Sequence, residues 1–155
     1  MPMRRFAVLI VLLLWPVVAH AQQKPGVDLK TLFEKARALG AESELRGDIA
    51  DRLGFGDHPL PITDLVITKD GVQHAVNAFI IGDKGYILFN SHLRVPEVYL
   101  FVKAVDGTMM SGLHGPQFQP ITKTVAMTPE DASVIAEEEA FWSQWLAAGA
   151  KVPLQ

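Results

Sequence analysis

The chain has 155 residues, with 14 Lys and Arg against 17 Asp and Glu, a formal net charge of −3, and no cysteine. The lack of cysteine excludes disulfides, thiol nucleophiles and thiolate metal sites. The mildly acidic balance, without a cluster of Lys or Arg, argues against nucleic acid and anionic lipid surfaces as partners.

Residues 1–21 have the three parts of a cleaved secretory signal peptide. Arg4-Arg5 forms a positive n-region, Phe6–Trp15 is a short apolar run, and Ala19-His20-Ala21 is a small-x-small cleavage site. The apolar run is shorter than the ~20 residues that a membrane span needs. We therefore predict cleavage after Ala21, a periplasmic or extracellular location, and no membrane span in the mature protein.

Cleavage leaves residues 22–155, which carry 12 Lys and Arg against 17 Asp and Glu and a net charge of −5. A chain of this length is typical of one domain. We expect a flexible leader at 22–27, a single α+β domain at 28–149 and a short tail at 150–155.

Two helices are predicted at the start of the domain. Asp28 is a suitable N-cap for a helix that runs to about Leu39. A second, weaker helix is expected from Glu42 to Leu53, where apolar residues recur every four positions and Gly47 weakens the pattern.

A β-meander of five to six strands is predicted next. Asp106-Gly107 is the strongest hairpin signal, because glycine suits the second position of a type I′ turn. The expected strands are Ile62–Thr68, Val72–Ile81, Tyr86–Leu93, Val98–Val105, Thr108–Leu113 and an edge strand in Ile121–Met127.

A C-terminal amphipathic helix closes the domain. Thr128 is a capping residue, Pro129 suits the first helical position, and Glu130 and Asp131 complement the positive end of the helix dipole. The order helices, meander, helix predicts an α+β fold with its helices on one face of an antiparallel sheet.

The hairpin at Gly82–Gly85 decides whether two histidines can meet. A four-residue loop would place His74 and His92 on opposite faces of the sheet. A three-residue loop ending in a glycine bulge would place both on one face, and we favour it because it separates polar from apolar residues better. It predicts a polar cluster at the open end of that face, composed of His74, Asn90, His92 and Arg94.

This predicted cluster has three interpretations. The simplest is the solvent-facing end of a sheet with ordinary polar residues. The second is a site that binds an anionic or other polar ligand. The third is a metal site, but nearby sequence supplies no further ligand, so we predict neither a metal nor a cofactor. On the other face, Asn77 needs a partner, and we expect Ser91 to provide it.

Glu138 is unusual because it falls within the apolar stripe of the last helix. If buried without a partner it would have a raised pKa, as general acids do; alternatively it pairs with a sheet cation such as Lys103. The stripe consists of Val134, Ile135, Phe141, Trp142, Trp145 and Leu146. Its aromatic trio Phe141, Trp142 and Trp145 predicts core packing, with an exposed patch for a partner protein as the alternative.

Two further stretches have weaker interpretations. Ser111 and His114 are close in sequence but lack the context of a nucleophile elbow. The loop that follows is a candidate partner-binding surface through His114, Gln117 and Phe118. Asp57-His58 precedes a proline and is more typical of a turn than of an acid–base pair.

Three functions remain open. We favour an exported, non-catalytic module that binds a protein or a small-molecule ligand, and we assign no catalytic residue. A small hydrolase or isomerase is the first alternative, which requires Glu138 to lie near His74 or His92. An inhibitor or immunity-type protein that acts on an exported partner is the second.

Overall fold

The computed structural model describes residues 26–56, 59–94, 97–122 and 127–152. The expected signal peptide with its cleavage site and the pair Asp57-His58 lie outside these ranges, as does most of the stretch expected to form a sixth strand.

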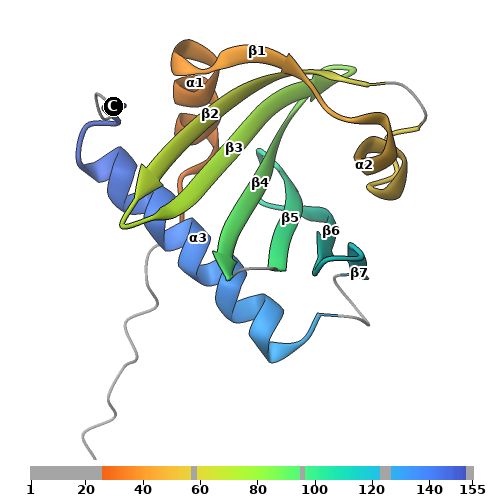
Figure 1. Cartoon of the computed structure of the whole chain (residues 1–155). Coiled ribbons are helices and arrows are strands. Elements are labelled where there is room, and N and C mark those ends of the chain that lie inside the picture. Colours follow the sequence, from red (N-terminus) through yellow and green to blue (C-terminus); the bar gives the residue numbers. More distant parts are fainter. Residues whose placement is uncertain (1–25, 57–58, 95–96, 123–126, 153–155) are drawn as a thin grey trace, which may run out of the picture.

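The chain forms an α+β fold with one seven-stranded antiparallel sheet, whose strands follow each other in chain order (Figure 1). A long C-terminal helix, α3, crosses the strands obliquely. The elements are α1 (Leu29–Leu39), β1 (Ala41–Glu44), α2 (Gly47–Arg52), β2 (Pro61–Lys69), β3 (Val72–Ile81), β4 (Lys84–Arg94), β5 (Glu97–Ala104), β6 (Met109–His114), β7 (Gln119–Ile121) and α3 (Pro129–Ala147).

The predictions of five to six strands and of two successive N-terminal helices are wrong. Residues 42–44, which were predicted to begin the second helix, instead belong to β1, whose residues 41–44 pair with residues 61–64 of β2. None of the β1 side chains is buried, so β1 has no alternating apolar pattern that a sequence could reveal. Its backbone hydrogen bonds to the neighbouring strand hold it in place.

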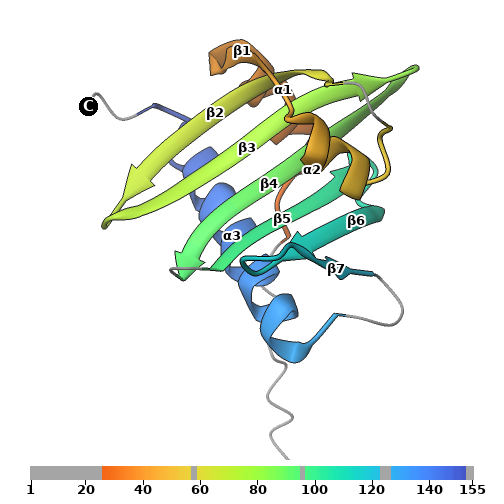
Figure 2. The ribbon, with the colours of Figure 1, turned by 45° about the vertical axis from the view of Figure 1, so that its right-hand side comes forward.

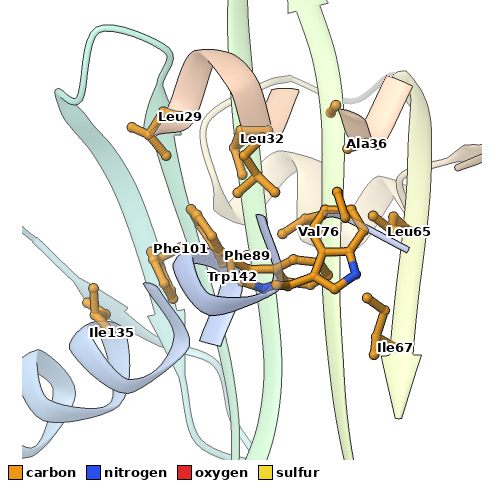
Figure 3. Close-up of a cluster of buried hydrophobic side chains, with 14 residues drawn as sticks. Leu29, Leu32, Ala36, Leu65, Ile67, Val76, Phe89, Phe101, Ile135 and Trp142 are labelled. Carbon is orange, nitrogen blue, oxygen red and sulfur yellow. The ribbon is translucent and has the colours of Figure 1, made fainter. Parts of the chain in front are cut away.

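The first face of the sheet is covered by α1 and α3. Leu32 of α1 and Trp142 of α3 are fully buried against Val76, Phe89 and Phe101 of the sheet (Figure 3). The rings of Phe89 and Phe101 stack with centroids 4.7 Å apart. This layer is the larger of the two cores and fixes the position of α3.

The second face carries another core beneath α2, so the prediction that all helices lie on one face is also wrong (Figure 2). Ala50 and Leu53 pack there with Phe79, and Phe55 meets Phe79 edge to face at 5.3 Å. Because both faces are covered, every residue from 74 to 79 is buried. Buried strands of this kind show no clean polar alternation.

The β3–β4 hairpin differs from both predicted registers. Ile81 pairs with Lys84, which leaves a two-residue loop, and His74 pairs with Ser91. Gly82 has a positive φ of 65°, as the first central residue of a type II′ turn requires. The prediction failed because it used polarity to choose a register on strands whose two faces are both packed.

Candidate functional site

The predicted polar cluster does not form as one site. Strand alternation from the His74–Ser91 pair places His74 on the α3 side of the sheet and Asn90 on the α2 side. The pairing of β4 with β5 shifts register between Ser91 and Arg94, so alternation does not assign His92 to a face. The backbone of Arg94 pairs with Glu97, but its side chain is outside the described part of the structure. The shared face predicted for His74 and Asn90 is therefore wrong.

His74 instead meets Glu138 beneath α3. The Glu138 side chain is fully buried, and its Oε2 lies 2.8 Å from Nδ1 of His74. Its Oε1 accepts a 2.9 Å hydrogen bond from Nε1 of Trp142, one turn further along the helix. The His74 ring stacks on Phe141 with centroids 3.7 Å apart. Both carboxyl oxygens of Glu138 therefore have a hydrogen-bond partner, which a buried carboxyl group requires.

Lys103 is not the partner of Glu138, contrary to one sequence interpretation. Lys103 forms an ion pair with the neighbouring Glu139. Successive helical residues point about 100° apart, so the two carboxylates reach different partners on the sheet.

Ser91 lies directly across the β3–β4 ladder from His74. Its side chain is fully buried, and its Oγ has no hydrogen-bond partner. It therefore does not satisfy Asn77, as the sequence suggested; the amide of Asn77 donates to Oδ1 of Asp64 at 3.0 Å. Ser91, His74 and Glu138 are the residue types of a hydroxyl–imidazole–carboxylate triad, but the Ser91 hydroxyl makes no hydrogen bond to the imidazole. All three are enclosed, which leaves a substrate no direct access to the hydroxyl.

A second histidine–carboxylate pair lies at the start of α3. Nδ1 of His114 on β6 is 2.9 Å from Oδ1 of Asp131, which is fully buried. The contact is close, but Oδ1 accepts no well-aligned hydrogen bond. Oδ2 of Asp131 accepts from the backbone of Thr128, while the Thr128 hydroxyl accepts from the backbone of Asp131. This reciprocal pair is a capping box.

Tyr99 lies beside this second pair, and its environment raises the pKa of its hydroxyl. Its ring centroid lies 5.6 Å from that of His114, and its hydroxyl donates to Glu97 at 3.1 Å. Burial, followed by the hydrogen bond and the negative charges of nearby carboxylates, raises the pKa of Tyr99 to about 12.

Two of the three side chains predicted to bind a partner at the loop after β6 are engaged in contacts within the protein. His114 is engaged with Asp131. Gln117 is exposed, and its backbone oxygen accepts from Arg52 at 2.8 Å. Phe118 packs against the core beneath α2. Of these three side chains, that of Gln117 is the one displayed on the surface.

A cleft of about 310 Å³, which no sequence pattern predicted, lies between β2 and α3. Its aromatic wall is formed by Phe141 and Trp145, two of the helical stripe residues for which a partner-binding patch is the alternative interpretation. The spacing of that stripe was visible, but its position beside the last residues of β2 depends on how α3 crosses the sheet. The cleft is lined by Ile67, Thr68 and Lys69 from β2 and by Phe141, Gln144, Trp145 and Ala148 from α3.

A larger cavity, of about 420 Å³, lies near β1 and the end of α1. It has a more polar lining, which includes Arg37, Glu42 and Thr63. Apolar walls with a few polar groups are more typical of ligand sites, so the cleft beside α3 is the better candidate.

Comparisons with known proteins give no family for the chain: no family model, curated protein or solved structure matches it. Across the described ranges, no helix is long and apolar enough to cross a membrane. Within the same ranges, no group of three or more His, Asp or Glu side chains is placed to hold a metal ion.

Proposed function

We propose that the protein is an exported, non-catalytic module that binds a partner through the cleft between β2 and α3. The cleft itself carries this proposal. Its volume of about 310 Å³ falls at the lower end of the range of ligand sites, roughly 300–1,000 Å³. Its walls are mainly apolar, while Thr68, Lys69 and Gln144 supply a few polar groups.

The histidine–carboxylate pairs support binding over catalysis. In each pair the carboxylate is fully buried, and in each it joins α3 to a strand of the sheet. Such contacts orient a helix on a sheet. Phe141, which stacks on His74, also lines the cleft, so the first pair supports one wall of the proposed site.

Two neighbouring alanines provide a test of the cleft. Ala148 lines it, whereas Ala147 does not, and both are exposed. Ala148→Trp would fill the cleft, and Ala147→Trp would add the same bulk outside it. We expect immobilised wild-type protein to retain a component of the exported fraction of the source cells, Ala147→Trp to keep that component, and Ala148→Trp to lose it. If both variants retain the same set of components, the cleft is not the binding site.

The enzyme alternative has one specific observation in its favour. Glu138 lies within hydrogen-bond distance of His74, which meets the geometric requirement set by the sequence analysis, and Ser91 stands opposite His74. Hydrolysis of p-nitrophenyl acetate is a suitable assay. Activity that Ser91→Ala abolishes and His92→Gln preserves would favour a hydrolase, since the histidine that pairs with Glu138 is His74. Wild-type protein with no activity above that of Ser91→Ala would count against it.

A further inference from the structure

The outer edge of β2 is free over half its length. β1 pairs with residues 61–64 only, and no strand in the described ranges pairs with the outer side of residues 65–69 (Figure 1). An edge of this kind presents unpaired backbone N–H and C=O groups, which can bind another extended chain.

The free edge and the cleft are adjacent. Ile67, Thr68 and Lys69 belong to the free half of β2 and also line the cleft, whose opposite wall is the C-terminal half of α3. A groove between a strand edge and a helix can bind a peptide in two ways at once. The edge forms main-chain hydrogen bonds with it, and the groove accommodates every second side chain.

We propose that an extended segment of a partner protein adds to β2 along residues 65–69 and inserts an apolar side chain into the cleft. This inference rests on the proposed function and specifies the kind of partner. The added strand would continue the line of β1 beyond Ala41, the residue at which β1 pairing with β2 stops.

Charge indicates the flanking chemistry of that segment. Lys69 lines the cleft, and the backbone of Lys151, another exposed lysine, accepts a 2.9 Å hydrogen bond from Nε1 of Trp145 in the cleft wall. The cleft lining contains no Asp or Glu; the adjacent Asp70 lies in the β2–β3 turn. In a chain with an overall excess of acidic residues, the one charged residue that lines the cleft is thus a cation. The segment should therefore carry acidic residues beside its apolar ones.

A second copy of the chain is a less suitable occupant. A lysine on an edge strand is a common device against pairing with an identical edge, and Lys69 holds that position. Two copies would also bring together two sets of lysines and two net negative chains, whereas an acidic segment complements the lysines.

The test uses a fluorescein-labelled peptide, Glu-Val-Phe-Val-Glu, and the wild-type protein in a fluorescence anisotropy titration. The first control is the same peptide with N-methylated valines, which cannot donate the main-chain hydrogen bonds. The second is the peptide with Lys in place of Glu. We expect saturable binding of the unmodified peptide Glu-Val-Phe-Val-Glu. Each control peptide should bind at least about tenfold more weakly. Ala148→Trp should weaken binding to a similar extent, and Ala147→Trp should leave it unchanged.

Three outcomes would overturn the inference. One is a dissociation constant above about 1 mM for the acidic peptide. Another is equal binding of the N-methylated peptide, which would mean that the cleft takes a side chain without strand addition. The third is self-association in sedimentation that Ala148→Trp abolishes, which would assign the edge to a second copy. If Ala148→Trp still loses a component of the exported fraction in any of these cases, the proposed function stands without strand addition.

Discussion

Helix α3 is joined to the sheet by two histidine–carboxylate pairs that differ in their surroundings. Asp131 and Glu138 are seven residues apart, about two helical turns, so both face the sheet. Glu138 lies mid-helix, and its partner His74 has 8% of its side chain exposed. Asp131 lies in the first turn, and its partner His114 has 27% of its side chain exposed.

The two carboxylates also differ in where their donors come from. Asp131 has a local partner in Thr128, three residues away, and it would keep this bond even if the helix moved. Glu138 depends on His74, which is 64 residues away, together with Trp142 of its own helix. The same chemistry thus forms a local cap in one place and a long-range connection in the other. Breaking the long-range connection should cost more, because it leaves donors buried without an acceptor.

The largest expected effect is that of Glu138→Ala. It removes the acceptor of both His74 and Trp142, and we expect a loss of about 3–5 kcal/mol in the free energy of unfolding, measured by urea denaturation. Glu137→Ala is the control: that side chain is exposed and accepts a hydrogen bond from the hydroxyl of Ser133 on its own helix, so we expect a change within about 0.5 kcal/mol. A loss below about 1 kcal/mol for Glu138→Ala would show that the buried pair does not hold α3.

Asp131→Ala should have a smaller effect. It removes the capping bond to the Thr128 backbone and the contact with His114, and we expect a loss of about 2 kcal/mol by the same measurement. Thr128→Ala removes the other half of the capping box and should cost about 1 kcal/mol. Equal losses for the two variants would mean that the His114 contact contributes nothing to stability.

The environment of the second pair also predicts a loss of stability in alkali. The pKa of Tyr99 is about 12 in the folded protein, against 10.0 for an ordinary tyrosine side chain. The unfolded chain therefore releases this proton first, and the free energy of unfolding should fall as the pH rises through 10 towards 12. Tyr99→Phe should reduce that fall, as measured by urea denaturation at about pH 9 and about pH 11. Identical pH dependence in the wild type and the variant would show that Tyr99 does not cause the loss of stability in alkali.

The smallest effect concerns Asp64, a partly buried carboxylate that accepts a hydrogen bond from an amide rather than from an imidazole. Burial raises the pKa of Asp64, while its hydrogen bond from Asn77 acts in the opposite direction. The folded state thus favours the protonated form, so stability should fall as the pH rises from 3.8, the ordinary pKa of an aspartate, through the raised pKa. Asp64→Asn should be at least as stable as wild type at neutral pH, with the difference shrinking in acid. Lower stability of the variant at neutral pH would show that the charged form is favoured.

Local signals in the sequence were reliable where the structure they specify is itself local. Thr128, Pro129 and Asp131 predicted the start of α3, and the structure confirms the cap. The bounds of β3 agree with the prediction, because turn residues delimit that strand on both sides. The Gly82-Asp83 pair is also a signal for the two-residue hairpin loop that the structure contains. Both predicted registers instead assume a longer loop, of three or four residues.

The sequence by itself determined the α+β class, the antiparallel order of the strands and the cap of α3, because capping, turn formation and side-chain periodicity act over a few residues. Only the tertiary structure decided that β1 joins the sheet, that helices cover both faces and that Glu138 meets His74. These features depend on contacts between segments far apart in the chain, whose free energy comes from shared burial and backbone pairing. The cleft beside β2 belongs to the same group, since its two walls come from elements about 70 residues apart.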